Sequence, residues 1–475
     1  MTRRINFGGS ALALGTVVSA VLVLSWSPFA LARQTQDHSS EPTAVDQWST
    51  QSQVPASSPR QTQNQPPATT KQRKLYCRYA ANPNKRRFGC KDEEFGWEET
   101  LTNDWSGARG EARNLGITPS ASYYSALQTN VTGGPRQAWG YVGQLTTAVD
   151  FNFEKLLRIP GMSLYFSNYW GTGSSLTATI GSVFPVTTNY GVGSHLGEIY
   201  LQQKLLNGDL TLAAGRLAAD YTFASLPVFD NYVSAGIDSN PISILSNDHS
   251  YVGPPPGLEW GAQALYNITP VVQAAAGVFN TNPNSANNGN IFAFQQGNKG
   301  ALVTAQLTYL YNQGPNPQGM PGQYTAGFFE DNDTFATLPL GVLSSEGNSG
   351  VFVLGQQMVY RPEGPGTTQG LTIWGACTYS WKRLVSPMPV FAGAGFSYES
   401  LIKQLKNDIV SVAYAYGKTS NFIPNASAGK LLEVNYQWAP RRYFRVIPDF
   451  QYIWNPTGTK GTASAGLGVR LNVTL

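Results

Sequence analysis

The sequence is poor in charge, in histidine and in cysteine. Charged residues make up 13% of its 475 residues, about half the share found in an ordinary soluble domain. It has three histidines and three cysteines, and no G-x-S-x-G, H-E-x-x-H or phosphate-loop spacing. With so few candidate nucleophiles and ligands, we expect neither an enzyme nor a bound cofactor or metal. The net charge of +4 gives no reason to expect nucleic acid as a partner.

Long apolar runs are also scarce, since the sequence has one near its start and none of about 18 residues after it. Arg3 and Arg4 precede apolar residues 11–24, and Ala30-Leu31-Ala32 has the form of a signal-peptide cleavage site. We therefore expect residues 1–32 to be a cleaved signal peptide. An uncleaved anchor is the alternative, and the glycine and serines that interrupt the run disfavour it.

A polar extension follows the expected signal peptide. Residues 33–75 are rich in Gln, Ser, Thr and Pro, so we expect them to be disordered. Residues 76–118 form a basic loop and an N-terminal segment that leads into the main body. Cys77 and Cys90 bracket the basic loop and would pair as a disulfide in an oxidising compartment. Residues 33–95 are either a solvated extension or a tether to peptidoglycan or another anionic polymer, and both interpretations remain open.

From residue 119 to the end, the dominant pattern has a period of two. Near the C-terminus, Leu467, Val469 and Leu471 alternate with Gly468 and Arg470. Such alternation is typical of a strand between lipid and a water-filled lumen, and the abundant aromatics near the predicted strand ends would form the interfacial girdles. The pattern predicts sixteen strands, near residues 119–129, 137–151, 161–172, 195–207, 209–218, 258–269, 270–280, 300–311, 321–329, 350–361, 368–382, 388–399, 408–416, 429–440, 443–454 and 462–475.

The connections between these strands alternate in length. Asn207-Gly208-Asp209 and Pro440-Arg441-Arg442 are tight turns, whereas every second connection is longer. Bacterial outer-membrane barrels have short periplasmic turns and long extracellular loops. The chain is therefore predicted to be all-β, a transmembrane antiparallel β-barrel over residues 119–475 in the cell outer membrane, with its N-terminal extension in the periplasm. The long connections are expected near residues 173–194, 219–257, 281–299 and 330–349.

Several segments resemble a known family. Residues 101–109 (LTNDWSGAR) resemble the L-x-G-D-W-G-G-x-R motif of carbohydrate-selective, OprB-type glucose porins, with Asn103 and Ser106 in place of two glycines. A short helix over Ser106–Asn114 is expected next. Residues 198–223 also resemble paired strands of that family, and residues 446–456 resemble its penultimate strand; the likeness runs in order over residues 100–475. The resemblance implies a sixteen-stranded barrel, passive diffusion that favours sugars, and no cofactor.

The inward faces are assigned by alternation. Acidic, basic and amide side chains are mixed there, which favours neutral polar solutes over ions. Each such residue either contacts the solute or belongs to a structural network in the lumen. The candidates are Gln144, Glu198, Gln202, Lys204, Glu259, Gln263, Glu433, Asn435, Arg445, Asp449 and Arg470.

The long connection at residues 219–257 is the candidate constriction. We expect it to fold into the lumen with Tyr221 and Phe223 stacking on sugar rings. Arg216 precedes this connection. Strict alternation along its strand would place Arg216 on the same side as residues that face lipid. By analogy with the family, we expect Arg216 to lie inside the barrel, turned by a bulge at Gly215, or at the rim.

The expected partners are small neutral sugars, outer-membrane lipid and lipopolysaccharide, and the barrel-assembly machinery. A homotrimer is an open alternative to a single barrel. A general, non-selective porin is the nearest alternative to a sugar porin, and a barrel whose N-terminal extension tethers it to the cell wall is another.

Overall fold

The structure is a computed structural model, and it describes residues 100–188, 191–248, 258–281, 300–313, 319–362, 369–402 and 404–475. The expected signal peptide, the linker at 33–75 and the Cys77–Cys90 pair lie outside the described residues. Within the described residues, no helix combines the length and the apolar character needed to cross a membrane.

Sixteen antiparallel strands close into a barrel in which each strand pairs with its sequence neighbour and β16 pairs with β1. The predicted fold class and strand number are therefore confirmed. The strands are β1 Ile117–Thr132, β2 Trp139–Asn152, β3 Met162–Ser174, β4 Gly193–Leu205, β5 Leu210–Leu217, β6 Glu259–Thr269, β7 Val272–Asn280, β8 Ala301–Tyr311, β9 Gly322–Ala336, β10 Ser344–Tyr360, β11 Gly370–Ser380, β12 Val390–Glu399, β13 Ile409–Lys418, β14 Gly429–Arg441, β15 Phe444–Trp454 and β16 Ser464–Thr474.

The alternation of side chains divides the barrel wall into two faces. Leu307, Val353 and Leu467 lie on the outer face, where each is half-exposed or more in the isolated chain. Neighbours of opposite parity, such as Thr308 and Leu354, are buried on the inner face. An apolar outer face is stable only against hydrocarbon, so the strands themselves identify a membrane barrel.

The prediction of a long loop at residues 330–349 was wrong, because these residues are mostly strand. β9 continues to Ala336 and β10 begins at Ser344, so the two form a long hairpin with a short turn. Inner positions stay buried along β9, whereas its outward residues change from Phe328 to the polar Glu330 and Asn332. A strand that extends beyond the hydrocarbon needs no apolar face. The alternation of apolar and polar residues therefore ends earlier along β9 than its hydrogen-bonded pairing with β10.

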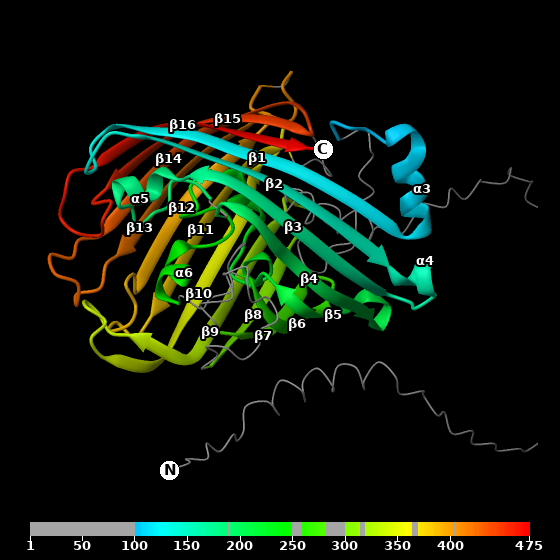
Figure 1. Ribbon diagram of the computed structural model, residues 1–475, viewed down its shortest axis with the longest axis horizontal. Coiled ribbons are helices and arrows are strands. Elements are labelled where there is room, and N and C mark those ends of the chain that lie inside the picture. The colour runs from blue at the N-terminus through cyan, green and yellow to red at the C-terminus, as the bar shows by residue number, and fades with distance from the viewer. Residues whose placement is uncertain are drawn as a thin grey trace, which may run out of the picture. The chain divides into compact units, whose positions relative to one another are not determined.

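A short helical segment precedes β1, as the sequence predicts. It consists of η2 Trp105–Gly107 and α3 Ala108–Leu115, and it lies at the end of the barrel opposite the long loops (Figure 1). Gly116 ends α3 with φ +100°, and a Cβ there would lie 2.9 Å from the Asn152 carbonyl oxygen. Glycine therefore allows α3 to approach α4 Phe153–Leu157, in the turn between β2 and β3.

Arg109 joins this N-terminal segment to the last strand. Its side chain is 1% exposed and donates to the Thr100 hydroxyl at 3.0 Å and to the Leu475 carbonyl at 3.0 Å. The guanidinium also lies 4.5 Å from the centre of the Trp105 ring. Burial lowers the pKa of Arg109, and the Asp104 carboxylate opposes that shift. The segment that resembles the family motif therefore clamps the seam where β1 meets β16.

Candidate functional site

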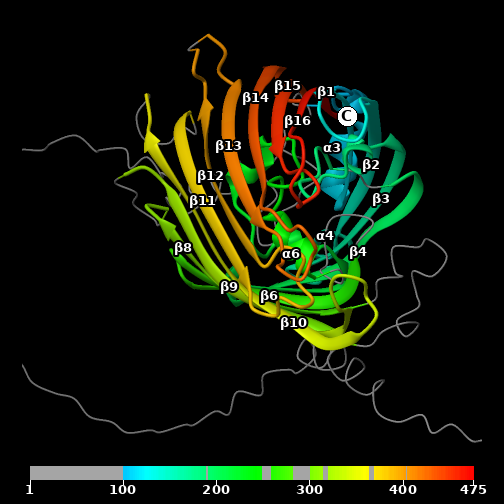
Figure 2. The same ribbon diagram turned by 90° about the vertical axis from the view of Figure 1, so that its left-hand side faces the viewer.

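Two connections at the long-loop end turn inward and narrow the lumen. The first inner loop (residues 175–188) contains α5 Leu176–Ile180, and the second inner loop (residues 218–248) contains η4 Ala219–Tyr221, η5 Pro227–Asn231 and α6 Ile242–Asn247. Figure 2 shows these segments inside the ring of strands. They face the polar inner wall and form the candidate functional site. The remaining 3-10 segment, η3 Leu206–Gly208, is a tight turn at the opposite end.

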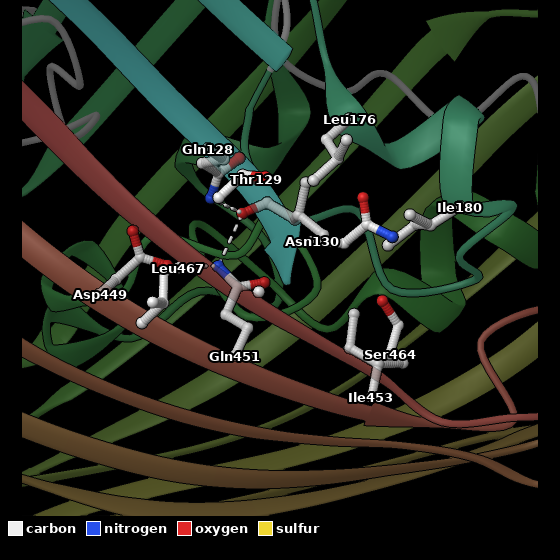
Figure 3. Close-up of a pocket in the computed structure, with 12 residues that line it drawn as sticks. Gln128, Thr129, Asn130, Leu176, Ile180, Asp449, Gln451, Ile453, Ser464 and Leu467 are labelled. Atoms are coloured by element: carbon white, nitrogen blue, oxygen red, sulfur yellow. Dashed lines mark hydrogen bonds between the residues drawn. The ribbon is translucent and has the colours of Figure 1, made fainter. Parts of the chain in front are cut away.

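The first inner loop is held against β1, β15 and β16 (Figure 3). The Val186 carbonyl accepts hydrogen bonds from the side-chain amides of Gln128 at 3.0 Å and Gln451 at 2.8 Å. Leu176 and Ile180 lie beside these bonds and line a small space of about 10 Å³. A space of that size holds about one water molecule, so this side of the lumen is filled by the loop.

The second inner loop is fixed most densely at residues 231–234. The Glu433 carboxylate accepts the Val233 amide at Oε1 (2.7 Å) and the Ser234 amide at Oε2 (3.0 Å). Asn435 donates to the Asn231 carbonyl at 3.0 Å, and Arg470 donates to the Tyr232 carbonyl at 2.9 Å. These residues are buried in the packed loop, so their backbone groups need protein partners, and the wall side chains supply them.

Tyr232 reaches across to the opposite wall. Its hydroxyl accepts from the Trp374 indole at 2.7 Å and donates toward the carbonyls of Phe396 and Val412 at 3.0 and 3.1 Å. Burial raises the pKa of Tyr232, so the hydroxyl keeps its proton and can act as that donor. The loop is thereby bonded to β11, β12 and β13 as well as to β14 and β16.

The two inner loops also bind each other. Thr188 donates to Asp238 at 3.1 Å, and Ser234 donates to the Pro185 carbonyl at 2.7 Å. Asp238 in turn lies 3.6 Å from the Arg470 guanidinium. The two loops and the wall therefore form one connected hydrogen-bonded unit.

The expected stacking of loop aromatics on sugar rings does not fit their positions. Phe223 is fully buried and packs edge-on against Phe279, and Phe229 is 1% exposed and packs edge-on against Trp374. Tyr221 is 7% exposed. These rings lie between the loop and the wall, where apolar area is removed from water, so their faces are covered.

Most other candidate residues lie on the inner face, as alternation assigns them. Gln202, Lys204 and Arg445 are partly exposed and lie toward the short-turn ends of their strands. Glu433, Asn435 and Arg470 are brought together by the second inner loop. The candidates that are buried on the inner wall are Gln144, Glu198, Glu259, Gln263, Glu433, Asn435, Asp449 and Arg470.

Arg216 lies one residue before the end of β5, next to the start of the second inner loop. The ladders with β4 and β6 run past Gly215 without a register shift, and Arg216 pairs with Ile199 and Trp260. The ladders therefore show no bulge at Gly215, although Gly215 itself has φ +148°. The Arg216 side chain is 2% exposed, so it is buried and does not lie open on the lipid-facing surface.

Two further wall residues that bind the second inner loop were not among the candidates. Gln306 accepts the Ala224 amide at 3.0 Å, and Gln356 accepts the Val228 amide at 3.0 Å. Both have inward parity on β8 and β10, so alternation alone would have assigned them to the lumen. Among the described residues, no cluster of His, Cys, Asp and Glu could hold a metal ion.

This chain is similar in sequence and in fold to known porins. The chain is 24% identical to the "Putative porin QuiX" of Acinetobacter baylyi, over 78% of this chain and 92% of that protein. Its fold matches two solved structures of Pseudomonas putida OprB. The high-pH form has a TM-score of 0.73 at 19% identity, covering 80% of this chain and 99% of that one. The low-pH form has a TM-score of 0.54 at 18% identity, covering 79% and 98%.

Residues 136–475 match the family described as "Carbohydrate-selective porin, OprB family". That match spans most of the chain and nearly the whole barrel. The protein is accordingly an outer-membrane porin that belongs to the carbohydrate-selective OprB family.

Proposed function

We propose that the barrel lets small carbohydrates diffuse passively across the outer membrane, through a lumen narrowed by the two inner loops. The short-turn end faces the periplasm and the long-loop end faces outward, the usual orientation of bacterial barrels. No energy source or chemical step is needed, since a concentration gradient drives the flux.

One observation carries this proposal, namely the way polar groups fill the inside of the barrel. Inward charges of both signs, such as Asp449 and Arg470, alternate with amides such as Gln144 and Gln451. A ring of one sign would select ions by charge. A wall of mixed sign has no strong net field, which favours neutral solutes, and its side chains hold the loops whose surfaces would meet the solute.

The test is transport by the purified protein in liposomes. Swelling rates are measured for a panel of mono- and disaccharides, and the ion current is measured on the same preparation in planar bilayers. The ion conductance gives the monosaccharide flux expected of a non-selective, water-filled pore. A sugar porin should pass monosaccharides faster than that expected flux. If the permeation rates of sugars and ions depend only on the size of the solute, the protein is a general porin instead. No swelling above empty liposomes would refute the proposal.

A further inference from the structure

The two inner loops border an open cavity of about 490 Å³ at the long-loop end of the barrel. Its volume lies within the range of roughly 300–1,000 Å³ that is typical of small-molecule pockets. We propose that this mouth cavity is a binding site for one neutral sugar or polyol, which it holds before passage. This inference rests on the proposed function and names the solute class of the pore.

Hydroxyl groups from both loops line the mouth cavity. Ser182 already donates to the Phe184 carbonyl at 2.6 Å, and Thr188 donates to Asp238 at 3.1 Å. A hydroxyl that has used its proton still has lone pairs with which to accept. These side chains are therefore fixed as acceptors, and the hydroxyl groups of a sugar are the donors that suit them.

A buried amide supplies a donor of the opposite kind. Asn240 lines the mouth cavity and is 1% exposed, and its Nδ2 has no hydrogen-bond partner among the described residues. A buried polar group without a partner costs free energy, and a small rotation of the Asn240 side chain toward the cavity would let a sugar oxygen accept its proton. The cavity thus matches a solute that both donates and accepts at short spacing.

The charges around the cavity favour a neutral solute. Among the described residues that line it, Asp238 is the one charged side chain, and no Lys, Arg or His is present. Arg470 lies 3.6 Å from the Asp238 carboxylate on the wall side, so its charge is already paired. An anionic sugar would find no cation in the cavity and would meet the carboxylate.

Ala178 provides a position at which to test the cavity. It lies on α5, lines the mouth cavity and is exposed, so a larger side chain can enter the space without disturbing the packed wall. Ala336 is a matched control, because it is exposed on β9 and lies outside the cavity. The variants are Ala178→Trp, Ala178→Lys, Ala336→Trp and Ala336→Lys, each assayed by liposome swelling with glucose and with glucuronate.

The wild-type protein is expected to pass glucose faster than glucuronate. Ala178→Trp should lower glucose swelling several-fold, whereas Ala336→Trp should not. Ala178→Lys should raise the glucuronate-to-glucose ratio roughly fivefold, which corresponds to an added attraction of about 1 kcal/mol, and Ala336→Lys should leave it unchanged.

The outcomes separate this inference from the proposed function. Absence of glucose swelling in the wild type would overturn the proposed function. Wild-type glucose swelling that is equally affected by substitutions at 178 and 336 would overturn the mouth cavity alone. Glucuronate passing as fast as glucose in the wild type would overturn the neutral specificity.

Discussion

Replacing Glu433 should loosen the second inner loop and widen the pore. Glu433 is fully buried on β14, and its carboxylate holds the Val233 and Ser234 amides at 2.7 and 3.0 Å. It contacts the backbone of the loop, so we regard it as a positioning residue. In Glu433→Ala, both amides lose their acceptor and the loop loses its attachment to β14 at this point.

The size of the effect follows from the hydrogen bonds. Leaving a buried backbone amide without its acceptor costs about 1–3 kcal/mol, so the two loop amides held by Glu433 together amount to about 2–6 kcal/mol. A loss of about 3 kcal/mol raises the population of the released loop roughly 100-fold. Glu433→Gln keeps one acceptor oxygen and places an NH₂ group opposite the other amide, so it should show an intermediate effect.

Single-channel recording and liposome swelling together provide the measurement. Glu433→Ala should show a larger and noisier conductance and should admit larger saccharides than the wild type. Glu330→Gln is the control, because Glu330 is an exposed carboxylate on β9. The variants must first show the heat-dependent shift in gel mobility of a folded barrel. A folded Glu433→Ala with wild-type conductance and size limit would refute the reasoning.

Two further predictions concern the stability of the barrel. Leu307→Arg places a charge at a lipid-facing position of β8 that is 57% exposed in the isolated chain, and should cost about 2–4 kcal/mol in denaturant unfolding from lipid vesicles. Leu206→Arg, in the turn between β4 and β5, should cost less than about 1 kcal/mol, and equal losses would contradict the assigned lipid face. Arg109→Ala removes the clamp to Leu475 and should lower the temperature at which the gel mobility shifts. Arg109→Lys should restore it only in part, because an ammonium lacks the forked geometry that reaches several acceptors, and an unchanged transition in Arg109→Ala would show that the clamp adds nothing.

The strands could be predicted because each one meets the same two environments along its length. Val469 and Arg470 on β16 must face lipid and lumen respectively, and this requirement appears directly as alternation in the sequence. The prediction was wrong at residues 330–349, where β9 extends beyond the lipid. There the outward face also meets water, as the exposed Glu330 and Asn332 show, so the hydrophobic pattern no longer distinguishes a strand from a loop.

The positions of the inner loops could be predicted only in outline. Length and aromatic content indicated that residues 219–257 turn inward, but the rings were expected to face the solute. Phe229 and Tyr232 instead pack against Trp374, which is more than 140 residues away in sequence. A loop sequence does not contain the shape of the wall that it meets, so the side on which its rings are buried could not be derived.

The inward polar residues of the wall have a different role from the one predicted, because they bind the inner loops. Alternation predicted Glu433, Asn435 and Arg470 as solute-contact candidates on the inner face, and in the structure their hydrogen bonds go to the backbone of residues 231–234. These polar side chains on the middle of the wall therefore hold the inner loops in place, and under the proposed function they would act on the solute only through those loops. Selectivity should then respond most to changes on the loop surfaces, such as Ala178, and pore size to changes in their anchors, such as Glu433. A barrel of this kind can change its solute through its loops while its strands, and the alternation that encodes them, stay the same.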